Sequence, residues 1–202
     1  LNNLGFVLLH NLNLAKEALP YFTDAIEINS RPEINDQKGI GIANGGLGDC
    51  YKKLGEIEKA SEHYQINLEI SHNNGDKQGI VRMTSMLGEI KYEIAKNEDE
   101  ENSRMELIDE AEDYYEESLA TAEDQENIIG MIFAFSGLIK VIVLSGHYEK
   151  CERVFLMIKE TAPGIKKAPD FAKDALKAVA AMLSDNTDVY DRDVKKIYKM
   201  MN

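Results

Sequence analysis

Hydrophobic and small residues recur along the chain three or four positions apart, which predicts pairs of amphipathic helices. In the clearest unit these residues lie on both sides of Gly55: Leu47, Gly48, Tyr51 and Leu54 before it, then Ala60, Tyr64 and Leu68 after it. Residues spaced in this way share one helix face, so two helices joined by a tight turn are predicted. Gly55 suits the turn because glycine takes a positive φ at little cost. Gly48 and Ala60 are small enough to let the helices approach closely, with Tyr51 and Tyr64 filling the space between them.

The pattern is repeated along the chain. The motif Asp-Gln-Lys-Gly-Ile at 36–40 returns as Asp-Lys-Gln-Gly-Ile at 76–80, forty positions later. The Leu-Gly-acid triplet that begins at Leu47 returns at Leu87, with the same offset. A further unit aligns from Gly130 onward, after one insertion in the unit before it. Self-similarity at a fixed period is typical of repeat proteins, in which each unit packs on its neighbours.

We therefore predict an all-α solenoid of antiparallel helix pairs that forms a single domain over 1–202. The units are expected at approximately these ranges: 1–35, 36–75, 76–125, 126–162, and a degenerate capping pair at 163–202. The third unit contains an acidic insertion at 96–108, which is expected to form a loop or a helix extension. The capping pair is expected as helices over 171–183 and 189–200. Because the first unit begins inside its first helix, we expect the chain to be a fragment of a longer protein.

Composition and charge exclude several classes of partner. The chain has 23 Lys and Arg residues against 36 Asp and Glu residues, a formal net charge of -13, which disfavours direct nucleic-acid binding. Cys50 and Cys151 form neither a disulfide framework nor a CxxC zinc motif, so a reducing, cytoplasmic location is expected. The apolar stretch 128–144 is shorter than a membrane span of about 20 residues and contains Lys140. A buried helix is therefore expected there, and no membrane partner.

No pattern in the sequence predicts chemistry. The segment 39–45 nearly matches the dinucleotide fingerprint, but Asn44 replaces its last glycine and no strand precedes it. Glu69 and His72 have the Glu-x-x-His spacing of diiron bundles, which need a second such pair that the sequence lacks. The acidic residues within 110–117 are expected to form a solvated helix face. We therefore expect no catalytic residue, no metal site and no cofactor, and we do not expect an enzyme.

The spaced residues also resemble a known family. The order of Leu47, Gly48, Tyr51, Ala60 and Tyr64 resembles the tetratricopeptide repeat (TPR) consensus, whose period is about 34 residues. The longer period here is similar to that of kinesin light chains, Pins-type polarity adaptors and bacterial Rap-type regulators. The resemblance covers approximately the first four units, and it implies a superhelix of TPR type.

In the proteins that this chain resembles, the first helices of successive repeats line a concave groove. Carrying the groove positions onto this sequence gives a set of candidate partner-binding residues: Asn3, Phe6, His10, Asp49, Lys52, Lys53, Arg82, Met86, Glu89, Tyr92, Phe133 and Lys140. Within this set, Arg82, Lys52 and Lys140 are expected to pair with acidic side chains of a partner. Tyr92 or Phe133 is expected to supply an apolar anchor.

The resemblance implies a non-catalytic module that binds a protein or peptide segment in this groove. The alternative is a sensory or regulatory TPR segment of a larger signalling or transcription-regulating protein. Self-association through an exposed terminal repeat is a further expectation. The acidic residues at 97–102 are expected to stay solvated, with recruitment of a basic partner as the alternative.

Overall fold

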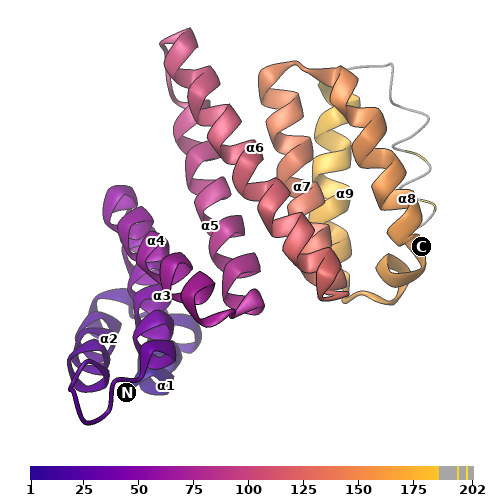
Figure 1. The fold of residues 1–202 in the computed structure, drawn as a ribbon. Helices are drawn as coiled ribbons and strands as arrows, with labels where there is room; N and C mark the ends of the chain where they lie inside the picture. The colour runs from indigo at the N-terminus through magenta and orange to yellow at the C-terminus, as the bar shows by residue number, and fades with distance from the viewer. Residues whose placement is uncertain (187–194, 196–198, 200–202) are drawn as a thin grey trace. The chain divides into compact units, whose positions relative to one another are not determined.

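The computed structural model describes residues 1–186, 195 and 199, and the regular elements of this part of the chain are all helical (Figure 1). In chain order the elements are α1 (Asn2–Phe6), the π-helical turn η1 (Val7–Asn11), α2 (Ala15–Asn29), α3 (Gln37–Leu54), α4 (Ile57–Asn74), α5 (Lys77–Lys96), α6 (Glu101–Asp124), α7 (Ile128–Ser145), the 3-10 turn η2 (Tyr148–Lys150), α8 (Cys151–Lys167) and α9 (Asp170–Asn186). The prediction of an all-α chain built from helix pairs is confirmed.

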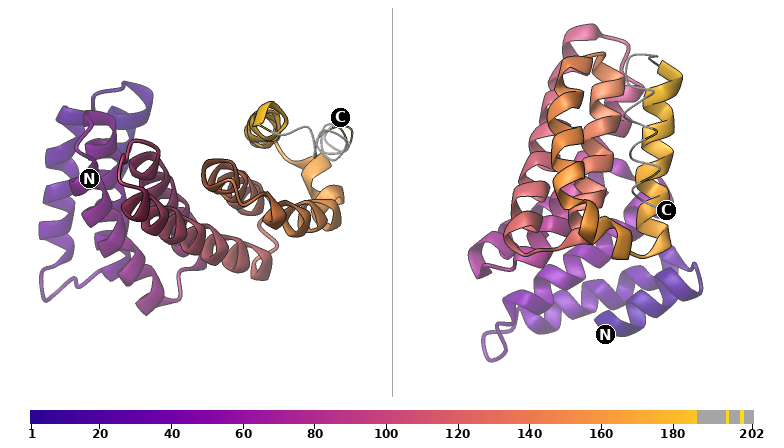
Figure 2. Two further views of the ribbon diagram at one scale, coloured as in Figure 1. Left: turned by 90° about the horizontal axis from the view of Figure 1, so that it is seen from above. Right: turned by 90° about the vertical axis from the view of Figure 1, so that its right-hand side faces the viewer.

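The contacts divide the chain into two compact units, residues 1–87 and residues 88–202, and the division falls within α5. In the first unit α2 packs on α1 and α3, and α3 packs on α4. In the second unit α7 contacts α6, α8 and α9 (Figure 2). We call α1, α3, α5, α7 and α9 the first helices of their pairs, and α2, α4, α6 and α8 the second helices.

The repeated links begin and end the first helices. Asp36, Asp76 and Asn127 each accept a hydrogen bond from the backbone N–H three residues later, at N···O distances of 2.9, 3.1 and 3.0 Å. Such caps satisfy backbone groups that the first helical turn leaves unpaired. Gly55 and Gly146 follow α3 and α7 with φ angles of 78° and 74°. The predicted glycine turn between the two helices of a pair is thus present.

Each unit packs large aromatic rings of the second helices on glycines of the first helices. Phe22 of α2 lies against Gly5 of α1, where an added Cβ would come within 2.7 Å of the ring, and against Gly46 of α3. Tyr64 of α4 lies on Gly48 of α3 so closely that a Cβ there would overlap the ring. Both rings are fully buried. The close approach predicted from the small residue at position 48 is therefore present.

The second unit repeats this packing. Tyr115 of α6 lies against Gly88, where an added Cβ would be 3.0 Å from the ring, and also against Gly137 of α7. Tyr115 is 2% exposed, so its ring is almost completely enclosed. Glycine at these positions lets two helices pack around one aromatic side chain.

The acidic insertion at 96–108 is mostly an extension of a helix. α5 ends at Lys96 and α6 begins at Glu101. The Glu100 carboxylate caps α6 by accepting hydrogen bonds from two backbone N–H groups, at 3.2 and 2.6 Å. Ile108 within this extension is 1% exposed. The polar residues can stay solvated on a helix, and the buried isoleucine fixes the extension to the rest of the unit.

α8 extends beyond residue 162, the approximate end predicted for the fourth unit. The helix continues through Pro163 to Lys167. A proline inside a helix removes one backbone hydrogen bond. The additional turn buries Ile165, which is 1% exposed, and this burial offsets the loss.

α9 covers the first helix predicted for the capping pair, at 171–183. Its residues Ala172, Leu176 and Val179 are buried, and the helix packs on α7. The second helix predicted for this pair, at 189–200, lies outside the described residues.

α7 is the most apolar helix in the described part of the chain. By length and composition it could cross a membrane, with a mean hydropathy of 2.3 over Ile128–Ser145, but 61% of this stretch is buried within the protein. It contacts three other helices of its unit. This is the arrangement expected of a core helix.

The packing of glycines on aromatic rings predicts whether a substitution in α7 raises or lowers the free energy of unfolding. Gly137→Ala should gain about 1 kcal/mol of helix propensity in isolation. The added methyl group would overlap the Tyr115 ring, which costs about 1–3 kcal/mol, so we expect a net loss of up to about 2 kcal/mol in the free energy of unfolding. Urea unfolding followed by circular dichroism measures the change. In a Tyr115→Ala background the same change should become neutral or stabilising, and a stabilising Gly137→Ala in the parent protein would contradict this packing.

Candidate protein-binding surface

Asp49 binds three of the side chains around it in the first unit. Its carboxylate accepts a hydrogen bond from the Tyr64 hydroxyl at 2.7 Å and from Nη2 of Arg82 at 2.5 Å. Nε2 of His10 lies 3.8 Å from the oxygen that Arg82 contacts. The Asp49 side chain is 14% exposed, and that of Arg82 is 44% exposed. Arg82, which was expected to pair with an acidic side chain of a partner, is therefore already paired with an acid of its own chain.

Glu89 forms a similar cluster in the second unit. Nζ of Lys140 donates to both carboxylate oxygens, at 2.9 and 2.8 Å, and the Tyr115 hydroxyl donates to the carboxylate at 3.1 Å. The same ammonium group lies 5.4 Å from the centre of the Tyr92 ring. Tyr92 is only 5% exposed, so its ring is part of the packing and Phe133 is the more accessible aromatic candidate.

The two clusters share a pattern that is also visible in the sequence. In both, a tyrosine of a second helix binds the acid that follows a Leu-Gly pair of the first helix. In the repeat predicted at 1–35, Phe22 takes the place of the tyrosine and has no hydroxyl. Phe6 takes the place of the acid, and its ring meets the Phe22 ring edge-on, with 5.0 Å between ring centres. In the repeat predicted at 126–162, Phe155 takes the place of the tyrosine and Lys140 takes the place of the acid. Along this chain an acid accompanies tyrosine and is absent with phenylalanine.

Two other candidates make contacts within the first unit. Phe6 stacks on the ring of His10, with 5.7 Å between ring centres. Nζ of Lys53 donates to the Leu9 carbonyl at 3.0 Å and to Oδ1 of Asn13 at 2.7 Å. Lys53 therefore ties α3 to the turn that follows α1 and has less freedom to bind a partner.

The remaining candidate binding residues are three in the first unit and Phe133 in the second. Asn3 is exposed on α1, and Lys52 and Met86 are half-buried on α3 and α5. Among the residues that the structure describes, no ion pair or hydrogen bond involves the side chain of Lys52. In the second unit Phe133 is 39% exposed and stacks on Phe171 of α9, with 6.3 Å between ring centres.

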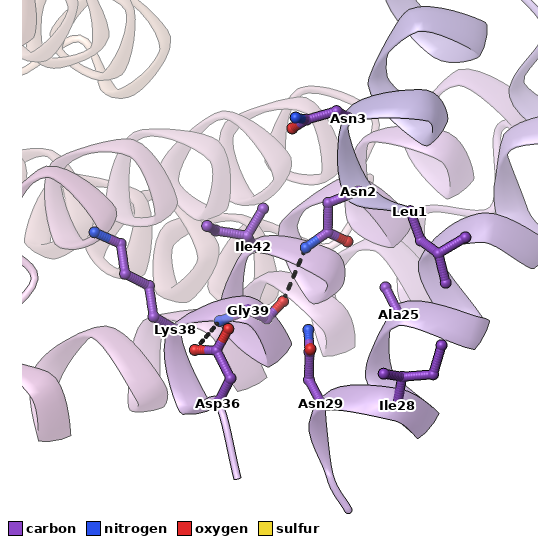
Figure 3. A pocket seen from close by; sticks show the side chains of 10 residues that line it. All are labelled: Leu1, Asn2, Asn3, Ala25, Ile28, Asn29, Asp36, Lys38, Gly39 and Ile42. Carbon is purple, nitrogen blue, oxygen red and sulfur yellow. Dashed lines mark hydrogen bonds between the residues drawn. The ribbon is translucent and has the colours of Figure 1, made fainter. Parts of the chain in front are cut away.

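A pocket of about 420 Å³ lies in the first unit, between α1, the end of α2 and the start of α3 (Figure 3). Nδ2 of Asn2 donates to the Gly39 carbonyl at 3.1 Å, while Oδ1 of Asn2 is buried without a hydrogen-bond partner. Asn3, Lys38 and Ile42 also line the pocket. Of the residues that line the pocket, only Asn3 was predicted as a binding residue, because the pocket depends on how three helices meet.

The side chains of the described residues give little support for a metal site or for a cysteine nucleophile. Cys50 and Cys151 are free and buried, and burial raises the pKa of both thiols to about 11. A buried thiol with a raised pKa holds very little thiolate at neutral pH. No group of three or more His, Cys, Asp or Glu side chains in the described part of the chain is placed to bind a metal ion.

The fold and these contacts define an α-helical protein built from repeated helix pairs. Residues 43–65, which span the second half of α3 and the first half of α4, match the family model described as tetratricopeptide repeat. This segment is therefore similar to a tetratricopeptide repeat, and repeats of this family generally bind proteins or peptides. A search of curated proteins finds no match. The narrower resemblance to kinesin light chains, Pins-type adaptors and Rap-type regulators stays a prediction.

The buried Tyr64 hydroxyl predicts how stability changes at high pH. Burial, reinforced by the Asp49 charge, raises the pKa of Tyr64 well above the ordinary value of about 10. The stabilisation is therefore fully present below pH 10 and is lost as the pH rises, since only the unfolded chain then releases this proton. The loss approaches about 1.4 kcal/mol per pH unit.

Tyr64→Phe removes this titration together with the hydrogen bond to Asp49. At pH 8 the variant should be less stable than the parent by about 1–3 kcal/mol. Between pH 10 and pH 11.5 the difference should shrink, because only the parent loses the Tyr64 contribution. Urea unfolding at each pH tests this, and a difference that stays constant across the range would refute the assignment.

Proposed function

We propose that this chain is a non-catalytic protein-binding module, which holds an extended or helical segment of a partner on the side formed by its first helices. The observation that carries the proposal is the tetratricopeptide repeat at 43–65, because α3 is the first helix of that repeat. Fold alone does not supply a function, so the surface has to be argued from its side chains.

One side of α3 offers a suitable surface in the first unit. We call this side the α3 strip: Lys38, Ile42, Gly45, Asp49 and Lys52. The spacing of four, three, four and three positions places these residues on one side of the helix. Lys38 and Ile42 are exposed, Asp49 and Lys52 are half-buried, and Gly45 between them is buried. The strip thus combines charged groups at its ends with an apolar side chain between them.

Neighbouring first helices border the strip. Asn2 of α1 donates to the Gly39 carbonyl of α3, and Arg82 of α5 reaches Asp49. A surface built from several helices is held more rigidly than a loop, which reduces the ordering cost of binding. In the second unit the exposed Phe133 and Phe171 are the corresponding apolar candidates. The regulatory alternative has no separate structural support, and we do not propose it.

Photocrosslinking tests the proposal with a matched control. The photoreactive residue p-benzoylphenylalanine is introduced at Ile42 on the α3 strip, or at Ile66 on α4, which is 42% exposed compared with 37% for Ile42. We expect the probe at Ile42 to crosslink to a specific protein in a lysate of the source cells and the probe at Ile66 not to. Equal crosslinking from both positions, or crosslinking from Ile66 alone, would contradict the proposed surface.

A further inference from the structure

The dipeptide Asn-Gly occurs twice in the chain, at 44–45 and at 74–75. Asparagine is a thermolabile residue, and in this pair the backbone nitrogen of the glycine can attack the side-chain carbonyl carbon of the asparagine. Glycine favours the attack because it has no Cβ to hinder the approach. The reaction also requires the asparagine backbone to leave the helical conformation and the glycine N–H to lose its hydrogen bond. The two copies share this chemistry and differ in their surroundings.

Asn44 is held in the core of the first unit, where it is 3% exposed. Its Nδ2 donates to the Ile40 carbonyl at 3.0 Å, and its Oδ1 lies 2.9 Å from Nδ1 of His63. Gly45 lies in the middle of α3, where an added Cβ would come within 2.8 Å of Nδ2 of Asn67. This pair has neither a free backbone nor room for a ring, so the fold blocks the reaction.

Asn74 and Gly75 have the opposite surroundings. Asn74 is the last residue of α4, and both residues are exposed. A Cβ placed on Gly75, whose φ is 64°, would meet no heavy atom within 4 Å apart from its chain neighbours. Among the residues that the structure describes, no hydrogen bond or ion pair holds the Asn74 side chain. The Gly75 N–H donates to the His72 carbonyl at 3.1 Å, and opening of this exposed last turn frees the nitrogen.

The pair also distinguishes the end of α4 from the ends of α3 and α7. Those helices end before Gly55 and Gly146, which have the same left-handed conformation, with φ angles of 78° and 74°. The residues before these two glycines are Leu54 and Ser145, whose side chains carry no amide. The same kind of turn therefore becomes reactive at the link between α4 and α5, where asparagine precedes the glycine.

We propose that Asn74 is the preferred site of spontaneous deamidation among the described residues, and that the product loosens the link between α4 and α5. The Gly75 nitrogen loses its proton to solvent and forms a bond to Cγ of Asn74. The Cγ–Nδ2 bond breaks, and the nitrogen leaves as ammonia with a proton from water. Water then opens the resulting imide ring at either carbonyl, which gives an aspartate or an isoaspartate. No electrons are transferred, and water is the co-reactant.

Either product weakens the end of α4. The new carboxylate lies at the negative end of the helix dipole and two residues before Asp76, whose own carboxylate caps α5 at 3.1 Å. An isoaspartate also adds one carbon atom to the main chain. The backbone hydrogen bond from Asp76 to Ser71, at 2.8 Å, then no longer spans the turn in its present geometry. The isoaspartate form should therefore be less stable than the aspartate form.

Incubation of the whole chain at pH 8 and 37 °C tests the site. Peptide mapping by mass spectrometry follows the gain of about 1 Da at each asparagine, and methylation by a protein isoaspartyl methyltransferase identifies the isoaspartate. We expect Asn74 to react at least about tenfold faster than Asn44, which is the internal control. In concentrated urea, which unfolds the chain, the two rates should agree within about threefold, because both pairs are then free.

Two variants and the purified product test the chemistry and its effect. Asn74→Gln should abolish the reaction at this position, because the longer side chain does not form the imide ring readily. Asn73→Gln changes the neighbouring exposed amide and should leave the rate at Asn74 within about twofold of the parent. The isoaspartate form, isolated by anion exchange, should have a Tm about 2–4 °C below the parent. Asn74→Asp adds the charge without lengthening the main chain and should lower the Tm less.

Other results overturn the proposal. Equal rates at Asn44 and Asn74 in the folded protein, or a faster reaction at another described asparagine, would show that the end of α4 is not the preferred site. A difference between the two rates that persists unchanged in urea would show that the fold does not protect Asn44. An unchanged Tm of the isoaspartate form would remove the effect on the link. The comparison of Asn44 with Asn74 is made within the parent protein, so it does not depend on whether a variant folds.

Discussion

The contact between an aromatic ring of a second helix and a glycine of a first helix is the constraint on which the other contacts depend. Tyr64 on Gly48 and Tyr115 on Gly137 leave no room for a methyl group between the helices. Glycine inside a helix costs about 1 kcal/mol relative to alanine. Burial of a whole aromatic side chain offsets this cost and also fixes the distance between the helix axes.

The polar contacts follow from this packing. A buried tyrosine needs a partner for its hydroxyl, and the acid after the Leu-Gly pair provides one. A carboxylate that is largely withdrawn from water in turn needs a positive charge nearby. Arg82 supplies it for Asp49, and Lys140 supplies it for Glu89. Core packing thereby determines which surface cations are already paired with an acid of the same chain.

This coupling changes what the charged residues can do in recognition. A free arginine or lysine would attract any anion, whereas a cation held by an internal acid binds only a ligand that competes with that acid. The net charge of -13 repels polyanions in general, while the first helices of the first unit are locally basic.

The sequence by itself determined the helices, their capping residues, the glycine turns and the repeat, because each depends on neighbours within one or two helical turns. Tertiary structure alone decided which charges pair, since Arg82 and Asp49 are 33 positions apart and Lys140 and Glu89 are 51 apart. It also buried Tyr92, which the helical period left equally compatible with a surface position. Periodicity assigns a residue to a helix face, whereas pairing and burial depend on how closely neighbouring helices approach, and here glycines and aromatic rings set that approach.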